Sequence, residues 1–173
     1  MLIKFGEYMI RDWHEADAPG IARYADNHAI AKNLRDGFPH PYSLADAEEF
    51  LAMVWQQDPR TYFALTTDTE VIGGIGLGKG VDVHRHTAEM GFWLAEPFWG
   101  RGIMTEAVKR FTEYSFMHFN LQRIYAEPYE TNPASARVLE KAGFTLEGIM
   151  RSNVVKKGRV LDQLLYARVQ GKV

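Results

Sequence analysis

The chain has 173 residues, which at the usual ~100–200 residues per domain predicts one domain. Apolar residues make up 46% and charged residues 24% of the sequence, a balance that excludes an intrinsically disordered chain. Twenty Lys and Arg against 22 Asp and Glu give a net charge of −2, which argues against a nucleic-acid binder with a basic face. The absence of cysteine excludes disulfides, cysteine-based zinc sites, iron–sulfur clusters and a thiol nucleophile in this chain.

Neither a membrane span nor a secretory leader is indicated. No apolar run is long enough to cross a bilayer, and residues 1–7 lack the apolar segment of a signal peptide. The sequence holds no internal repeat, low-complexity tract or linker-like stretch. We therefore expect a single domain over residues 1–173 that is soluble and cytoplasmic, with no membrane or nucleic-acid partner.

The first elements are short. Residues 8–11 are typical of a strand, and apolar residues spaced three and four apart predict a helix over residues 17–28. Pro39 and Pro41 make residues 36–42 a loop, since two prolines within three residues cannot continue a helix.

A helix and a hairpin come next. Ser43, with Asp46 three residues later, resembles a capping box that opens a helix. The apolar stripe of that helix consists of Phe50, Leu51, Val54 and Trp55. Residues 61–65 and 71–77 are rich in strand formers and flank a turn at 67–70, which predicts a β-hairpin.

The second half of the sequence alternates strands and helices. Residues 87–94 alternate strictly, and the expected core face consists of Ala88, Met90, Phe92 and Leu94. A turn at 96–97 and a glycine loop precede a helix whose expected buried face is formed by Met104, Ala107, Val108, Phe111 and Ser115. The last elements are a strand at 121–126, a helix from Asn132 to Gly143, and strands at 144–155 and 160–169 joined by a turn at 156–159. The fold class is α+β with a mixed sheet.

Two segments are rich in glycine, and the first resembles a phosphate-binding loop without meeting its requirements. Residues 73–80 (GGIGLGKG) nearly match the phosphate-binding pattern G-x-x-x-x-G-K-[ST]. However, Gly80 replaces the hydroxyl residue that holds magnesium, and residues 81–84 do not open a helix. We predict instead a strand whose glycines admit a close neighbour or a ligand.

The second segment, residues 98–107 (FWGRGIMTEA), follows a predicted strand and leads directly into an amphipathic helix. Its two glycines allow consecutive N–H groups to face an anion, and the helix start adds unpaired donors and about half a positive charge. Arg101 adds a mobile cation and Thr105 a hydroxyl group. The segment fits a pyrophosphate, and the alternative is an ordinary tight strand-to-helix turn.

Together with residues 132–144 (NPASARVLEKAGF), this loop resembles the GNAT superfamily of acetyl-CoA-dependent N-acetyltransferases, and within it the RimJ/RimL-like branch. Further segments with the same resemblance follow in chain order: 38–43, 88–94, 147–151 and 158–162. The resemblance implies a GNAT fold, with a mixed twisted sheet flanked by helices in one domain. One departure is Pro97, which occupies the position where the family's pyrophosphate loop usually has Gln or Arg.

The resemblance also implies acetyl transfer from acetyl-CoA to a primary amine, either a protein N-terminal α-amino group or a small amine. With no cysteine available, direct transfer in a ternary complex is the natural mechanism. Glu89 is the best candidate for the general base, and a structural carboxylate is its alternative. A backbone N–H around Leu94 or Ala95 would hold the oxyanion. No metal is expected.

The leaving thiolate has no tyrosine acid, because the position where many relatives have tyrosine is Leu139 here. Ser135 is the substitute by analogy with the branch, and its alternative is a helix-surface serine bonded to backbone. Asn132 fits both an N-cap and a contact with the pantetheine arm. The expected cofactor-binding residues are Leu94, Trp99, Gly100, Arg101, Gly102, Ile103, Met104, Thr105, Asn132, Arg137 and Lys141.

Other interpretations stay open. Asp82, His84 and His86 would share one side of an extended chain, the spacing of a metal site, though loops before strands commonly carry such residues. The acceptor groove is expected between residues 36–42 and the final hairpin, with Phe38, Tyr42, Asp36 and Asp162 available to orient a cation. A non-catalytic acyl-CoA-binding or sensing module on the same fold is the rival function. The resemblance also allows a homodimer.

Overall fold

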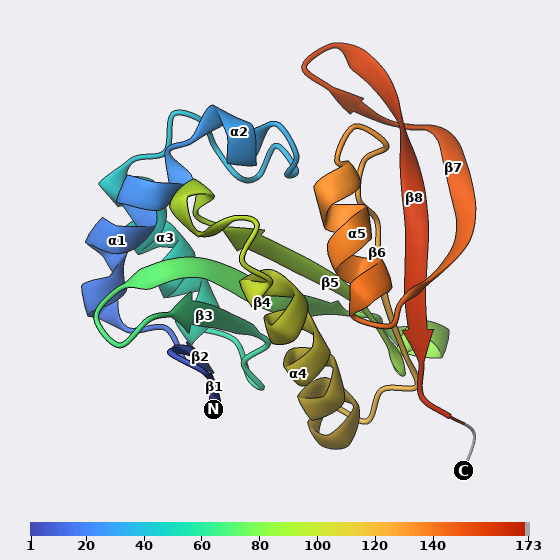
Figure 1. Ribbon diagram of the computed structural model, residues 1–173, viewed down its shortest axis with the longest axis horizontal. Helices are drawn as coiled ribbons and strands as arrows, with labels where there is room; N and C mark the ends of the chain where they lie inside the picture. The colour runs from blue at the N-terminus through green and yellow to red at the C-terminus, as the bar shows by residue number, and fades with distance from the viewer. Residues whose placement is uncertain (172–173) are drawn as a thin grey trace. The chain divides into compact units, whose positions relative to one another are not determined.

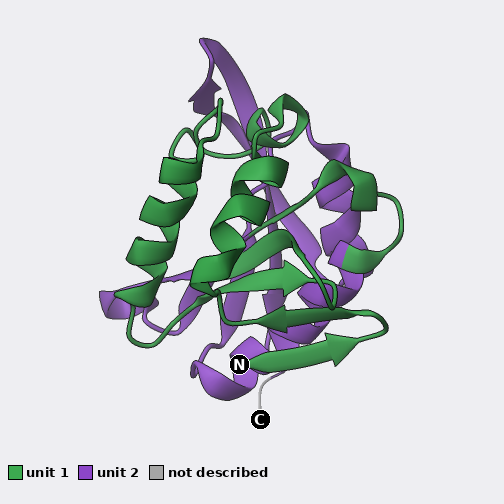
Figure 2. Ribbon diagram, turned by 90° about the vertical axis from the view of Figure 1, so that its left-hand side faces the viewer, with its two compact units in different colours: residues 1–76, 92–103 green, residues 77–91, 104–173 purple. Residues whose placement is uncertain are grey.

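The computed structural model describes residues 1–171 (Figure 1). The chain divides into two compact units. Unit 1 comprises residues 1–76 and 92–103, and unit 2 comprises residues 77–91 and those from 104 onward (Figure 2). Hydrogen bonding orders the eight strands as β1-β2-β3-β4-β5-β6-β8-β7. The β5–β6 pair is parallel, whereas the other pairs with a described register are antiparallel, so the sheet is mixed and the fold is α+β.

Unit 1 is an antiparallel sheet region covered by helices. Its strands are β1 (Leu2–Phe5), β2 (Tyr8–Arg11), β3 (Tyr62–Thr66) and the part of β4 (Val71–Lys79) up to Gly76, paired in chain order. Its helices are α1 (Ala18–Ala25), α2 (His28–Ala31) and α3 (Leu44–Trp55), with 3-10 turns η1 (Glu15–Asp17) and η3 (Glu96–Phe98). The capping box predicted for α3 is confirmed, because the Asp46 N–H donates to Ser43 Oγ at 3.2 Å and the Ser43 N–H donates to Asp46 Oδ2 at 2.7 Å.

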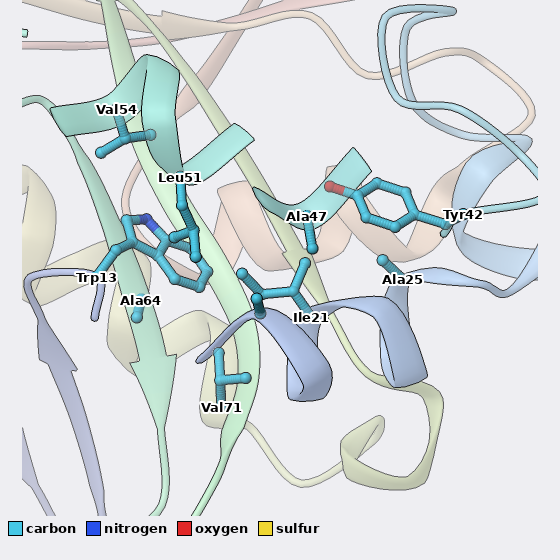
Figure 3. Packing of buried hydrophobic residues seen from close by; sticks show 10 residues of the cluster. Trp13, Ile21, Ala25, Tyr42, Ala47, Leu51, Val54, Ala64 and Val71 are labelled. Atoms are coloured by element: carbon cyan, nitrogen blue, oxygen red, sulfur yellow. The ribbon is translucent and has the colours of Figure 1, made fainter. Parts of the chain in front are cut away.

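The core of unit 1 lies between its helices and strands. Trp13, Ile21, Leu51 and Val71 are 1–3% exposed and point toward one another from four different segments (Figure 3). Each such side chain contributes roughly 1.5–3 kcal/mol when it leaves water, which is why the helices stay on this face. Trp55 departs from the predicted apolar stripe of α3, since it is 38% exposed.

Unit 2 contains the part of β5 (Thr87–Leu94) up to Gly91, and this part pairs in parallel with β6 (Arg123–Ala126). The chain order then reverses, because β6 pairs with β8 (Arg159–Val169) and β8 pairs with β7 (Thr145–Lys156). Its helices are α4 (Ile103–His118), which begins at the last residue of unit 1, and α5 (Pro133–Lys141), with the 3-10 turn η2 (Asp82–His84). The five residues predicted for the buried face of α4 are all buried.

The sequence predictions fail in two places in unit 1. The strand β1 was not predicted. The helix expected over 17–28 ends at Ala25, and a separate short helix, α2, begins at His28. The break has a local cause, because the Asn27 side chain accepts a hydrogen bond from the Ala29 N–H at 2.7 Å and so caps a new helix.

The glycines at 73, 74, 76 and 78 belong to a strand, as predicted, and not to a nucleotide loop, and Gly80 directly follows that strand. A Cβ on Gly76 would lie 2.4 Å from the Tyr62 ring, and a Cβ on Gly74 would lie 2.9 Å from Trp93 Nε1. These positions need glycine because neighbouring groups occupy the space of a side chain. Among residues 1–171, no helix is both long and apolar enough to cross a membrane.

Candidate active site

The loop before α4 has the backbone that an anion-binding turn needs. Gly100 and Gly102 adopt φ of +75° and +76°, a left-handed conformation that side-chain-bearing residues rarely adopt. The next two residues, Ile103 and Met104, are 3% and 5% exposed, so only their backbone N–H groups can serve a ligand. The first N–H groups of a helix have no partner within the helix, which leaves donors at this turn. The arrangement suits a phosphate group.

The two larger side chains of the loop are held by the chain itself. Arg101 donates from Nη2 to the Pro97 carbonyl oxygen at 2.8 Å, and its guanidinium lies 5.5 Å from the centre of the Phe98 ring. Trp99 donates from Nε1 to the Leu94 carbonyl oxygen at 2.7 Å. Arg101 therefore keeps its charge at the loop, whereas the indole N–H of Trp99 is committed to backbone.

The end of β5 offers the backbone predicted to hold an oxyanion. Of the two candidate donors, the Ala95 N–H donates to the Ile72 carbonyl oxygen at 2.7 Å. That bond occupies the Ala95 donor, and the prediction narrows to the Leu94 N–H. Leu94 itself is 8% exposed, so its side chain is part of the apolar packing.

Glu89 lies in the part of β5 that belongs to unit 2. It is half-buried and sits in register with Tyr125 of the parallel strand β6. The neighbouring register pair, Ala88 and Ile124, is fully buried, so Glu89 and Tyr125 share the opposite and more open face of these strands. The register places the Glu89 carboxylate beside the Tyr125 ring. The assignment of Glu89 as the general base stays a prediction.

Helix α5 begins as the sequence predicted. Asn132 is its N-cap, with the side-chain oxygen accepting a hydrogen bond from the Ser135 N–H at 3.2 Å, and Pro133 is its first residue. Ser135 is half-buried near that end. Gly143 follows the helix with φ of +87°, the usual left-handed stop.

The rest of α5 divides into core and surface. Leu139 is completely buried, so the position where many relatives have tyrosine is a packing position in this chain. Arg137 pairs with Glu140 at 3.2 Å on the surface, and Lys141 is exposed. A partner for Arg137 within the helix makes it a weaker candidate for a phosphate contact, and Lys141 stays a prediction.

One predicted grouping of possible metal ligands is not found. Asp82 and His84 lie in the 3-10 turn η2, not in an extended chain, and Asp82 has φ of +53°. The one-sided alternation expected for Asp82, His84 and His86 is therefore wrong. Within residues 1–171 no three His, Cys, Asp or Glu side chains come together as a group that could hold a metal ion.

Two of the residues predicted to orient the acceptor make contacts within the fold. Tyr42 is 7% exposed within the core of unit 1, and burial raises its pKa to about 12. Asp162 accepts a hydrogen bond at Oδ1 from the Ser152 N–H at 2.7 Å, where it holds a distorted stretch of β7. Both residues have structural roles. Phe38 packs at a ring distance of 6.0 Å from Trp93, and the prediction for it remains open.

Sequence reasoning missed the backbone partners at this site. The carbonyl oxygen of Ile72 and the Gly73 that approaches Trp93 closely both belong to β4, some twenty residues before the end of β5. A carbonyl oxygen is present at every position, so no residue type marks it in advance. The glycine at 73 was the one available signal.

The chain is similar to known proteins. The family model described as "Acetyltransferase (GNAT) domain" matches residues 8–145. A probable N-acetyltransferase, YjcK, of Bacillus subtilis is 40% identical over 105 residues, which cover 60% of this chain and 58% of that protein. The spermidine N(1)-acetyltransferase of Vibrio cholerae is 28% identical over 146 residues, covering 83% of this chain and 84% of that protein.

Solved structures share the fold over nearly the whole chain. RimL, a ribosomal L7/L12 α-N-protein acetyltransferase in complex with coenzyme A, aligns with a TM-score of 0.87 at 21% identity and covers 98% of both chains. The matched part of this chain spans only 58% of the length of YjcK. It spans only 54% and 56% of the lengths of two other curated relatives, from Bacillus licheniformis and Bacillus subtilis. Because the family model covers most of the sequence, the chain belongs to the GNAT acetyltransferase domain family.

Proposed function

We propose that this chain transfers the acetyl group of acetyl-CoA to a primary amine by direct transfer in a ternary complex. The observation that carries the proposal is the turn before α4, where left-handed glycines at 100 and 102 open the backbone to a diphosphate in a chain of the GNAT family. The amine nitrogen forms the new C–N bond, the C–S bond breaks, and the electron pair leaves with sulfur as coenzyme A thiolate. The amine proton passes to a base.

The residues divide this work. The loop N–H groups, with the Arg101 charge beside them, would bind the pyrophosphate, and Thr105 and Lys141 would add polar contacts. The Leu94 N–H would donate to the carbonyl oxygen as it becomes an oxyanion, since the Ala95 N–H is already bonded to Ile72. The Leu94 N–H acts on charge that develops only in the transition state, which is where stabilisation raises the rate.

Proton transfer would use Glu89, which can take the amine proton directly or through one water. Ser135 would protonate or hydrogen-bond the leaving sulfur, because the side chain of Leu139 is buried and has no group that can donate a proton or a hydrogen bond. A coenzyme A thiolate is also stable enough to leave without an acid. Direct transfer, without an acetyl-cysteine intermediate, agrees with the absence of cysteine from the sequence.

The acceptor is proposed as a protein N-terminal α-amino group or a small amine such as a polyamine. Proteins similar to this chain are named for both kinds of substrate, a ribosomal L7/L12 α-N-protein acetyltransferase and a spermidine N(1)-acetyltransferase. Assays should therefore include both.

The test measures free thiol released from acetyl-CoA with peptides of different N-termini, polyamines, amino sugars and amino acids. Glu89→Gln is compared with Glu48→Gln, which changes an exposed glutamate of α3. Acceptor-dependent release that falls at least ~10²-fold in Glu89→Gln and is unchanged in Glu48→Gln supports the proposal and the base.

Two other results would change the assignment. Release that survives Glu89→Gln keeps the transferase and removes Glu89 as the base. Tight acetyl-CoA binding with no acetyl transfer to any acceptor would favour a non-catalytic acyl-CoA sensor over an enzyme.

A further inference from the structure

The backbone around Leu94 is held on both sides by other segments of unit 1. Leu94 is the last residue of β5, and its N–H is the donor proposed for the oxyanion. A backbone donor stabilises a transition state only when it already points to the place where charge will develop. Its direction depends on the two peptide groups that flank the residue, one shared with Trp93 and one shared with Ala95.

The peptide group between Leu94 and Ala95 is bonded at both ends. Its N–H donates to the Ile72 carbonyl oxygen at 2.7 Å, and its carbonyl oxygen accepts from Trp99 Nε1, also at 2.7 Å. Both distances are at the short end of the normal range for N–H···O hydrogen bonds. Because the two bonds act on opposite edges of one planar group, they oppose its rotation about the chain axis.

The peptide group between Trp93 and Leu94 is held by close packing. An added Cβ on Gly73 would lie 2.4 Å from the Trp93 carbonyl oxygen and 3.2 Å from Leu94 Cα. Strand β4 therefore approaches this peptide group as closely as its backbone allows, and only glycine permits that approach. Leu94 is thus fixed by Ile72 and Gly73 of β4 on one side and by Trp99 on the other.

Trp99 is the one side chain among these three contacts. Its side chain lies in the turn that precedes α4, next to the left-handed Gly100. The residue is 44% exposed, so burial of its ring does not by itself account for a large aromatic side chain at this position. The hydrogen bond to Leu94 gives its indole N–H a specific partner.

We propose that Trp99 is a positioning residue that holds the Leu94–Ala95 peptide group and thereby aims the Leu94 N–H at the thioester carbonyl. The inference rests on the proposed acetyl transfer. It also assigns Trp99 a role different from the direct cofactor contact that the sequence suggested. Because Trp99 adjoins the diphosphate turn, it connects the segment that binds the cofactor to the donor that activates its acetyl group.

The test removes the indole N–H and keeps an aromatic ring. Trp99→Phe does so with natural residues, and replacing Trp99 by 3-benzothienylalanine exchanges the N–H for sulfur in a ring of nearly the same shape. Trp55→Phe is the matched control, since Trp55 is 38% exposed and its Nε1 donates to the Trp13 carbonyl oxygen at 3.4 Å. Three quantities are measured: kcat, KM for acetyl-CoA, and the hydrogen-exchange rate of the Ala95 amide by NMR.

The expected result separates positioning from binding. Both Trp99 variants should lose about 10- to 100-fold in kcat, since misplacing a preorganised donor has effects of this order. KM for acetyl-CoA should change less than ~3-fold, because the backbone donors of the turn remain. Ala95 amide exchange should accelerate in both Trp99 variants, and Trp55→Phe should leave all three quantities unchanged.

Other results would overturn the inference. A kcat within ~2-fold of the unmodified chain, or a KM that rises in parallel with the loss of activity, would make Trp99 a surface residue or a direct cofactor contact. If the unmodified chain transfers no acetyl group, the proposed function fails. The exchange measurement then still tests whether Trp99 holds the Leu94–Ala95 peptide group. Unchanged Ala95 exchange in both Trp99 variants would then show that the indole does not hold the peptide group.

Discussion

Gly73→Ala probes the contact between β4 and the end of β5. The new methyl group would lie 2.4 Å from the Trp93 carbonyl oxygen, whereas ordinary contacts are 3.4–4 Å. The two atoms would have to separate by about 1 Å (3.4 − 2.4), and both belong to backbone or are attached to it. A flexible side chain could move aside, but a carbonyl group in a hydrogen-bonded strand cannot move without its neighbours.

The size of the effect follows from three contributions. Overpacking of a tight interior costs about 1–3 kcal/mol. Displacing Trp93 also strains the adjacent hydrogen bond from the Ala95 N–H to Ile72, worth about 1 kcal/mol. Alanine restricts the unfolded chain and offsets roughly 0.4–1 kcal/mol of this loss. The expected net loss in the free energy of unfolding is about 1–3.6 kcal/mol, or roughly 2–14 °C in Tm for a chain of this size.

The assay is urea unfolding followed by circular dichroism, with Gly78→Ala as the matched control. Gly78 belongs to the same strand and has no atom within 4 Å of the position of an added Cβ. Its substitution should change the free energy of unfolding by no more than ~1 kcal/mol. The m-value, the slope of that free energy against urea concentration, should stay constant in both variants. Equal midpoints for the two variants would refute the reasoning, because they would mean that the Gly73–Trp93 contact relaxes without cost.

Two further predictions concern the diphosphate turn and the core of unit 1. Gly102→Ala places a side chain at φ of +76°, so we expect weaker coenzyme A binding by calorimetry, with Gly37→Ala, an open loop position, as the unaffected control. Burial, with a smaller effect from the charge of Asp46, raises the pKa of Tyr42 to about 12 from its ordinary value of 10.0. Its contribution to stability is therefore complete below pH 10 and is lost as the pH rises to 12, because the unfolded chain ionises first. Tyr42→Phe should lose less stability than the unmodified chain across that interval, and parallel pH profiles would contradict the prediction.

The elements predicted correctly are those with local chemical signals. Ser43 and Asp46 cap α3 through each other, and Asn132 caps α5 as its position before Pro133 indicated. The strict alternation of residues 87–94 predicted β5 with its correct bounds. In each case the signal consists of a few neighbouring residues, so it can be read directly from their spacing in the sequence.

The elements missed have weak local signals. Strand β1 is four residues long, too short for an alternation to stand out, and its pairing with β2 depends on a turn in which Gly6 has φ of +57°. The predicted helix over 17–28 extends past Ala25 because the helical spacing of its residues continues to that point. The side chain of Asn27 ended it by capping the next helix instead.

The sequence by itself determined the family, the order of most elements and the glycine turn before α4, because left-handed glycines, caps and alternating strands are properties of neighbouring residues. Only the tertiary structure decided that Tyr42 belongs to the core and that Ala95 is already bonded. It also decided that the indole N–H of Trp99 donates to the Leu94 carbonyl oxygen. These outcomes depend on backbone carbonyl groups and on the distance between strands. Every residue has the same carbonyl group, so its partner is chosen by the folded chain.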